Sequence, residues 1–317
     1  MSGRSPNLLR LAIVALTILF TVSMNLTNNV VYAGEGRDEE AQQQRIHSDT
    51  TVSNPSVSVG INHTLHIAFL GDSITYGQRP KVRHLGPVRE PFPARAISLL
   101  NKEASSLACE VHHTVHAFIG ATLPSFLESQ QWRDFFGQKS RRYDIVVVCL
   151  GVNDIISRGT SWTEEYNRTF HNALQQLRST LRQRATMVLF IEPLRMPPLR
   201  VQDTPEELLK VLDRLVLGPL RDVARKERWD VLRVGSASFY PFGPYCMTDP
   251  TYFYDGVHPT KEGHRALGNF VAQRLTRVVA KLCQGASRKD LTFVKVPHTR
   301  DLKVCPSGLL DLALKMF

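Results

Sequence analysis

Residues 64–77 read TLHIAFLGDSITYG and place a short apolar run directly before a polar turn. The run Thr64–Leu70 is too short for a typical helix and consists mostly of residues that strands bury. Gly71 and Asp72 end it abruptly, and Ser73 follows. The stretch therefore predicts a strand that is buried on both faces, as in a parallel sheet.

Four further apolar runs repeat this pattern, and amphipathic stretches separate them. The runs are Val111–Phe118, Ile145–Leu150, Met187–Ile191 and Val231–Val234. The stretches with apolar residues at helical spacing are 92–103, 124–136, 162–183, 205–228 and 260–282. Alternation of strand and helix is typical of a parallel sheet with helices on both faces. We predict a three-layer α/β/α sandwich with a flavodoxin-like, five-stranded parallel sheet in the order 2-1-3-4-5.

Residues 1–33 have the pattern of a secretory signal. Arg4 and Arg10 precede the uncharged apolar run Leu11–Met24, and Ala33 lies where a signal peptidase would cut. The apolar run has 14 residues, which is short for a membrane span. We therefore predict cleavage after Ala33 and a secreted or secretory-pathway protein, with an uncleaved signal anchor as the alternative.

Composition predicts the remaining boundaries of the chain. Residues 34–60 are polar and poor in bulky apolar side chains, which predicts a flexible leader. Residues 61–283 contain all the predicted strands and helices and form the expected folded domain. Residues 284–317 are a basic tail with an apolar end, which we expect either to dock on the domain or to fray.

Five cysteines are compatible with the disulfides that a secretory route permits. Because the number is odd, at least one cysteine stays unpaired in a monomer. Cys149 lies inside an apolar run and is predicted to be a buried free thiol. The other four allow three pairings, which the sequence leaves open: Cys109, Cys246, Cys283 and Cys305.

The net charge of +10 favours anionic surroundings such as acidic glycans or lipid headgroups, so at most peripheral membrane association is expected. No Lys/Arg tract is interleaved with aromatic residues, and we expect no nucleic-acid binding. No Cys/His cluster has the spacing of metal ligands, and we expect no metal. Glycosylation sequons at Asn62 and Asn167 suit the secretory route.

Polar residues with chemical potential follow several of the predicted strands. In open α/β sheets, ligands bind at the carboxyl ends of the strands. Ser73 follows the first strand, Gly120 the second and Asn153 the third, and the loop after the fifth strand leads to Asp255 and His258. Each motif alone has a structural explanation as a turn or a helix cap. Their joint occurrence at one edge of the sheet predicts a site.

Asp154, next to Asn153, is assigned the structural role of a helix cap, with its carboxylate at a helix N-terminus. The other residues supply the parts of acyl transfer. A serine hydroxyl is a poor nucleophile until a base removes its proton, and His258 can act as that base for Ser73. Asp255 lies three residues before His258, so a tight turn can bring its carboxylate to one imidazole nitrogen.

The tetrahedral intermediate of acyl transfer carries an oxyanion that needs preorganised donors. The candidates are the backbone N–H groups of Ser73 and Gly120 and the side-chain amide of Asn153. A glycine suits such a position because backbone without a side chain can approach a ligand closely.

Four stretches together resemble the sequence blocks of SGNH (GDSL-type) serine hydrolases: Gly71–Gly77, Gly120, Gly151–Asp154 and Asp255–Pro259. The resemblance covers residues 64–282. It implies Ser73 as nucleophile and first oxyanion donor, Gly120 and Asn153 as further donors, Asp255 and His258 as the other triad members, and no cofactor. An α/β-hydrolase would need Gly-x-Ser-x-Gly at its nucleophile, and no serine of this chain has that setting.

The resemblance implies esterase, lipase, lysophospholipase, thioesterase or acyltransferase activity. We expect hydrolysis of a carboxylic ester, with an O-acetyl group on a glycan as the leading substrate. Lysophospholipase or acyltransferase activity is the alternative within the same chemistry. A non-catalytic secreted glycan-binding protein on the same fold is the alternative of another class, and the intact Ser73, Asn153 and His258 argue against it.

Two segments near the predicted site leave their roles open. Gln78–Glu90 carries several basic residues that either hold an anionic substrate or form a solvated loop. Phe239–Tyr254 is rich in aromatic residues that either line a pocket or pack a long loop onto the domain. No long apolar lid insertion is evident, which favours a small ester on a soluble substrate over a lipid interface. Acyl chain length and oligomeric state are not predicted.

Overall fold

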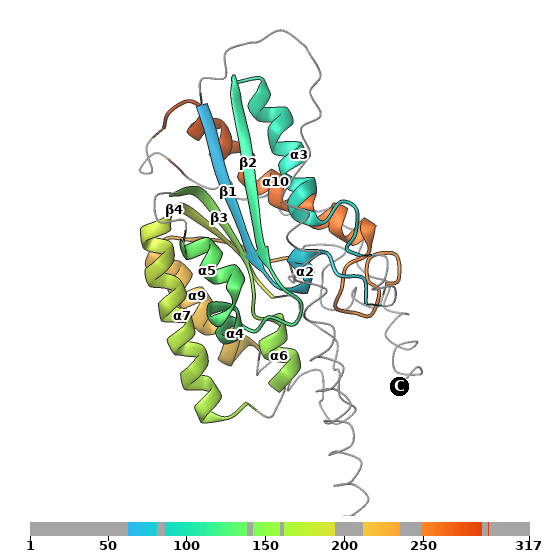
Figure 1. The fold of residues 1–317 in the computed structure, drawn as a ribbon, viewed down its shortest axis with the longest axis vertical. Helices are drawn as coiled ribbons and strands as arrows, with labels where there is room; N and C mark the ends of the chain where they lie inside the picture. Colours follow the sequence, from blue (N-terminus) through green and yellow to red (C-terminus); the bar gives the residue numbers. More distant parts are fainter. Residues whose placement is uncertain are drawn as a thin grey trace, which may run out of the picture. The chain divides into compact units, whose positions relative to one another are not determined.

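Five parallel strands form the centre of the described chain, in the predicted order β2-β1-β3-β4-β5 (Figure 1). The computed structural model describes residues 63–80, 86–137, 142–158, 162–193, 212–234, 249–286 and 291. The strands are β1 (His63–Gly71), β2 (Cys109–Ala117), β3 (Tyr143–Cys149), β4 (Ala185–Ile191) and β5 (Asp230–Leu232). Each overlaps a predicted apolar run, so the sequence located all five.

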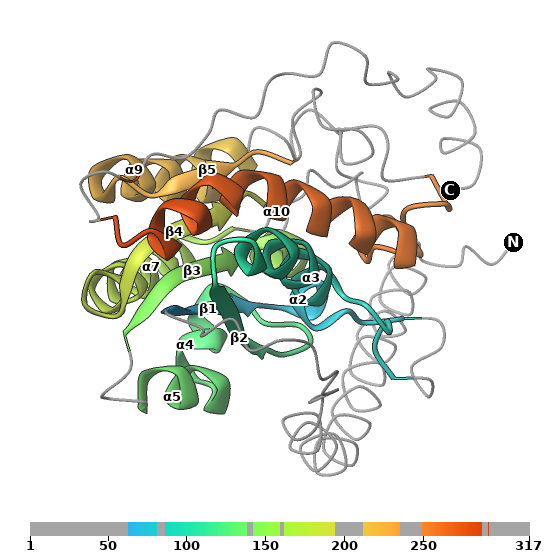
Figure 2. The same cartoon turned by 90° about the horizontal axis from the view of Figure 1, so that it is seen from above.

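Helices cover both faces of the sheet, as predicted for a three-layer α/β/α sandwich. Figure 2 shows α3 (Phe92–Ser105) and α10 (Lys261–Cys283) on one side of the sheet and α4 (Leu123–Glu128) and α5 (Gln130–Gly137) on the other. Two separate apolar clusters fill the spaces between the layers. One contains residues of α3 and α10, and the other contains residues of α4, α5, α7 and α9.

The helical elements have the following bounds: α2 (Ser73–Tyr76), α3 (Phe92–Ser105), α4 (Leu123–Glu128), α5 (Gln130–Gly137), α6 (Val152–Arg158), α7 (Glu164–Arg184), η4 (Leu212–Leu217, a π-helical segment), α9 (Gly218–Glu227) and α10 (Lys261–Cys283).

Two predicted helices differ from the observed ones. The stretch 124–136 is divided at Ser129, whose backbone is extended and whose hydroxyl accepts the Trp132 N–H at 3.2 Å. A side chain that caps a new helix competes with continuation of the old one. The described part of 205–228 is a π-helical segment followed by α9. Pro219 lies in the first turn of α9, where its missing N–H is tolerated.

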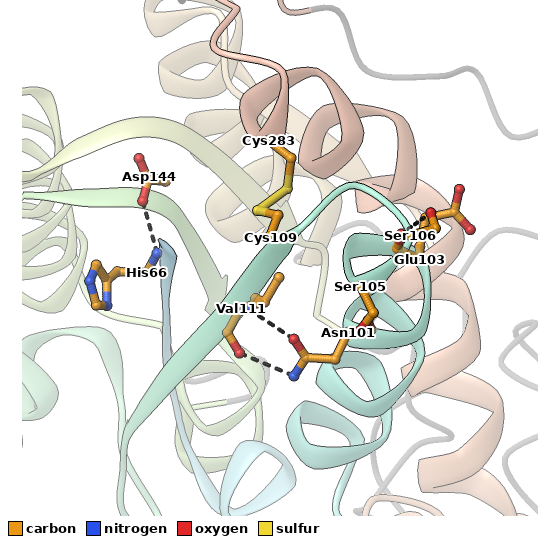
Figure 3. Close-up of a disulfide and its surroundings, with 9 residues drawn as sticks. All are labelled: His66, Asn101, Glu103, Ser105, Ser106, Cys109, Val111, Asp144 and Cys283. Carbon is orange, nitrogen blue, oxygen red and sulfur yellow. Dashed lines mark hydrogen bonds between the residues drawn. A yellow bond between two sulfur atoms is a disulfide. The ribbon is translucent and has the colours of Figure 1, made fainter. Parts of the chain in front are cut away.

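A disulfide joins Cys109, at the start of β2, to Cys283, at the end of α10 (Figure 3). The structure therefore pairs Cys109 with Cys283, a choice that the sequence left open. The crosslink spans 174 positions, and closing so long a loop in the unfolded chain stabilises the fold by about 5 kcal/mol in the chain-entropy account. Cys149 is a buried free thiol, as predicted. Cys246 and Cys305 lie outside the described residues.

β2 is an edge strand of the sheet, and a side chain covers its outer edge at one point. Asn101 Oδ1 accepts the Val111 N–H at 2.8 Å, and its Nδ2 donates to the Val111 carbonyl at 3.1 Å (Figure 3). The amide of Asn101 therefore takes the place of a neighbouring strand. Such a contact hides backbone groups that another chain could otherwise pair with.

Several predictions fall on residues that the structure does not describe. These are the signal segment 1–33, the leader 34–60, Asn62 and nearly all of the tail 284–317. Among the helices that are described, none is both long enough and apolar enough to cross a membrane.

Candidate active site

The carboxyl ends of β2, β1 and β3 lie level with one another. Gly71, the last residue of β1, pairs with Ala117 of β2 on one side and with Cys149 of β3 on the other. The segments that carry Ser73, Gly120 and Asn153 leave the sheet from this common edge. Figure 1 shows α2 and α6 at the same end of the sheet.

The structure brings Ser73, His258 and Asp255 into one hydrogen-bonded chain. Ser73 begins α2 directly after β1, and its Oγ lies 3.0 Å from His258 Nε2 across 185 positions of sequence. His258 Nδ1 lies 2.8 Å from Asp255 Oδ2. Each imidazole nitrogen therefore faces the partner that the sequence predicted for it.

Asp255 is held by the turn that carries His258. Its Oδ1 accepts the N–H groups of Val257 and His258 at 3.0 and 2.8 Å. Partial burial acts to raise the pKa of Asp255, but the hydrogen bonds from His258 and Val257 outweigh it and hold this pKa below its ordinary value. The carboxylate is ionised at neutral pH and can only accept. His258 Nδ1 therefore carries the proton, which leaves Nε2 free to accept from the Ser73 hydroxyl.

The two further residues predicted to donate to an oxyanion are Gly120, in the loop after β2, and Asn153, in the first turn of α6. Gly120 has φ +78°, a conformation that favours glycine, and among the described residues beyond its chain neighbours no heavy atom lies within 4 Å of where a Cβ would be. The Asn153 amide donates one hydrogen to the Ala121 carbonyl at 3.0 Å. Since an amide nitrogen has two hydrogens, one donor remains for a ligand. Asn153 is therefore bonded to the loop that carries Gly120.

Asp154 acts as a helix cap, as predicted, but its described partners lie on other helices than its own. It lies in the first turn of α6 and is wholly buried. Its Oδ2 accepts the N–H of Leu123, the first residue of α4, at 2.9 Å. Its Oδ1 accepts the hydroxyl of Tyr166 from α7 at 2.7 Å. The sequence offered no signal for Tyr166, because the contact depends on how α6 and α7 pack.

Asp72, immediately before the nucleophile, is a buried carboxyl group that the sequence interpretation overlooked. It caps α2, with Oδ1 accepting the Ile74 N–H at 2.9 Å, and the residue is wholly buried. Burial raises the pKa of Asp72 to about 7, although the Ile74 N–H and His258 act to lower it. Its position inside the Gly-Asp-Ser turn was the signal that could have identified it.

His264 is a second buried titratable residue beside the site. It lies in α10, it is wholly buried, and its Nδ1 accepts the Phe92 N–H at 3.3 Å. Burial, with a smaller effect from His258, lowers the pKa of His264 to about 3. The imidazole is therefore neutral at any pH near neutrality and joins the first turn of α10 to that of α3.

Asp72 and His264 give the free energy of unfolding opposite pH dependences. The folded state holds an extra proton at Asp72 between the unfolded pKa of 3.8 and the folded value of about 7. It holds one proton fewer than the unfolded state at His264 between the folded value of about 3 and the unfolded pKa of 6.5. Asp72 thus lowers the stability as pH rises through this window, His264 lowers it as pH falls, and the two slopes cancel.

Single variants should separate the two slopes. In Asp72→Asn, we expect the free energy of unfolding to fall, relative to that of the wild type, by about 1.4 kcal/mol for each pH unit on going from pH 6 to pH 4, because the opposing contribution of Asp72 is removed. In His264→Gln, whose amide oxygen can still accept from Phe92, the free energy of unfolding should fall, relative to that of the wild type, by about the same amount per unit as pH rises from 4 to 6. Urea unfolding across this range measures both slopes, and profiles parallel to that of the wild type would contradict the shifted pKa values.

The two segments with open roles are described only in part. Arg79 donates to the Pro87 carbonyl at 2.8 Å and so braces the basic segment from within, while residues 81–85 lie outside the described ranges. At the end of the aromatic segment, Phe253 is buried in the core and Tyr252 packs against it. These contacts of Tyr252 and Phe253 favour the second role considered for the aromatic segment, which is packing of the loop onto the domain. Positions 239–248 are not described.

No group of three or more His, Cys, Asp or Glu side chains in the described ranges is arranged to hold a metal ion. The site consists instead of a serine, an imidazole, a carboxylate and hydrogen-bond donors.

This chain is similar to solved structures and to a protein-family model. An acetylxylan esterase from Geobacillus stearothermophilus is 17% identical, with a TM-score of 0.48 over 73% of this chain and 98% of its own. A lipase/acylhydrolase from Enterococcus faecalis is 19% identical, with a TM-score of 0.47 over 68% of this chain and 96% of its own. No curated protein matches the chain in sequence.

A model of the GDSL-like lipase/acylhydrolase family matches residues 69–266. This match begins inside β1 and ends inside α10, and it includes Ser73 and His258. It covers more than half of the sequence, so the chain belongs to the GDSL-like lipase/acylhydrolase family and is an ester hydrolase.

Proposed function

We propose that the chain cleaves carboxylic esters through an acyl-enzyme on Ser73, with His258 as general base and acid and Asp255 as the residue that orients it. One observation carries this proposal. The Ser73 hydroxyl, the His258 imidazole and the Asp255 carboxylate form a continuous chain with contacts of 3.0 and 2.8 Å. These distances lie within hydrogen-bond reach for a nucleophile and its base.

In the first half-reaction, Ser73 Oγ attacks the carbonyl carbon of the ester as His258 Nε2 takes the hydroxyl proton. The oxyanion that forms accepts hydrogen bonds from the Ser73 and Gly120 N–H groups and the free hydrogen of Asn153. The imidazolium then gives its proton to the alkoxy oxygen as the C–O bond breaks, and the alcohol departs. Asp255 stabilises the imidazolium throughout, because its carboxylate accepts from Nδ1.

In the second half-reaction, water attacks the acyl-enzyme while His258 removes one of its protons. Collapse of the second tetrahedral intermediate breaks the bond to Ser73 Oγ, and His258 returns a proton to that oxygen. The products are a carboxylic acid and the free serine. Loss of a single oxyanion donor slows such reactions by about 10²–10³-fold, which sets the scale for each donor here.

For the substrate, we propose an O-acetyl group on a glycan. The sequence shows no long apolar lid insertion. The net charge is +10 for the full chain and +8 without Arg4 and Arg10 of the predicted signal, which suits an acidic polymer such as a uronic-acid glycan. An acetylated sugar presents a small acyl group, which agrees with the lack of a long apolar insertion in the sequence.

For localisation, we propose secretion, with retention by a signal anchor as the second possibility. The signal pattern of residues 1–33 supports this proposal. The disulfide between Cys109 and Cys283 supports it independently, because such bonds form and persist in oxidising compartments.

A substrate panel tests the proposed ester. The secreted protein is assayed with acetylated acidic and neutral glycans, p-nitrophenyl esters of increasing acyl length, and lysophospholipids. We expect kcat/KM for acetyl esters to exceed that for decanoyl esters by about tenfold or more, as a pocket shaped for a small acyl group discriminates at this level. Preference for lysophospholipids would replace the glycan proposal. Absence of turnover on every ester would favour a binding protein.

A further inference from the structure

Tyr166 lies outside the segments that carry the proposed catalytic residues. Its hydroxyl nevertheless bonds to Asp154, the neighbour of Asn153 in α6. Tyr166 belongs to the first turn of α7, where its N–H is bonded to the capping Thr163 hydroxyl at 3.1 Å. Its ring lies edge-on against Trp162, with centroids 4.9 Å apart. The backbone and the ring therefore fix the direction in which the hydroxyl points, which is toward Asp154 Oδ1 at 2.7 Å.

Asn153 and Asp154 hold the loop after β2 at two points. The Asn153 amide donates to the Ala121 carbonyl at 3.0 Å, and Asp154 accepts the Leu123 N–H at 2.9 Å. The two anchored positions lie one and three residues after Gly120. A displacement of Asp154 would therefore move the backbone next to the Gly120 N–H and the Asn153 amide at the same time.

We propose that Tyr166 is a positioning residue for the oxyanion hole, acting through Asp154. The inference rests on the proposed function, since it assigns the donor role to Gly120 and Asn153. The Tyr166 hydroxyl donates to Oδ1 of Asp154 and so keeps Oδ2 in place to accept the Leu123 N–H. A carboxylate that is buried and bonded in this way has few alternative orientations. Oxyanion donors stabilise charge only when they are held in place before the reaction begins.

Tyr166→Phe removes only the hydroxyl and keeps the ring against Trp162. We expect kcat for p-nitrophenyl acetate to fall by about tenfold with KM within about twofold, because the donors act on the transition state and not on the bound ester. A boronic acid that forms a tetrahedral adduct on Ser73 should bind about tenfold more weakly, in parallel with the loss in kcat/KM.

Tyr143→Phe is the matched control. Tyr143 is buried, whereas Tyr166 is partly buried, and Tyr143 begins β3 at the opposite end of the strand from the site. We expect its kcat and its affinity for the boronic acid to stay within about twofold of the wild type, whatever its melting temperature. Equal losses of kcat in both variants would show a general effect of lost stability and would overturn the inference.

A second comparison uses Asn153→Ala, in which one oxyanion donor is missing. Groups that act as one unit give non-additive losses, so Tyr166→Phe should reduce kcat less in this background than in the wild type. The same tenfold loss in both backgrounds would contradict action through the oxyanion hole.

If the wild type turns over esters and Tyr166→Phe matches it, only this inference fails. If the wild type itself neither turns over esters nor binds the boronic acid, the proposed function fails.

Discussion

Replacing Ser73 by alanine is expected to lower kcat/KM for p-nitrophenyl acetate by about 10⁵-fold or more, because no other group can form the acyl-enzyme. His258 Nε2, 3.0 Å from Ser73 Oγ, would lose the hydroxyl that it deprotonates. The donors assigned to the oxyanion hole would remain, so a small activity above the uncatalysed rate is compatible with this prediction. Steady-state hydrolysis with the purified variant measures the loss.

Ser105→Ala serves as the control for this variant. Ser105 lies on α3 and its hydroxyl donates to the Asn101 carbonyl in an exposed position. We expect its kcat/KM to stay within about twofold of the wild type. Turnover by Ser73→Ala at the level of this control would remove Ser73 from the mechanism.

Asp255→Asn is expected to reduce kcat by about 10³–10⁴-fold at neutral pH, with a smaller effect on KM. The amide oxygen can still accept from the N–H groups of Val257 and His258, so the turn should persist. The amide nitrogen, however, would face His258 Nδ1 and require an acceptor there. The imidazole would then carry its proton on Nε2 and could not accept from Ser73.

Asp249→Asn provides the comparison, because Asp249 Oδ1 accepts the Thr251 N–H in a turn just before the same segment. We expect this variant to keep kcat within about twofold of the wild type. A loss below about tenfold in Asp255→Asn would mean that the carboxylate does not set the tautomer of His258.

Much of the fold could be predicted from the sequence because short apolar runs and amphipathic stretches report on burial locally. The run at Thr64–Leu70 became β1, and the turn after it became α2. The break at Ser129 was not predicted, because a single hydroxyl that caps α5 leaves the apolar pattern unchanged. The π-helical segment before α9 was not predicted either.

The geometry of the candidate site was predicted where the residues follow strands. Ser73, Asp255 and His258 form the expected contacts, and Asn153, in α6, is bonded to the loop that carries Gly120. Their catalytic roles stay predictions until the variants are measured.

What the sequence could not predict depends on contacts between distant positions. The bond between Tyr166 of α7 and Asp154 of α6 depends on how the fold places the two helices, and His264 meets Phe92 across 172 positions. The partner of Cys109 could not be chosen from spacing for the same reason. The raised pKa of Asp72 requires knowledge of its complete burial, which no local pattern shows.

The most direct test of the central claim is covalent labelling of the native protein. A fluorophosphonate reacts with a serine oxygen that a base has activated, releasing fluoride and leaving a stable phosphonyl group. Tandem mass spectrometry of the digested product then identifies the labelled residue. We expect a single adduct per chain, on Ser73, and none on the same peptide from His258→Ala. An adduct on another serine, or no adduct on an enzyme that turns over esters, would contradict the assignment of Ser73 as the nucleophile.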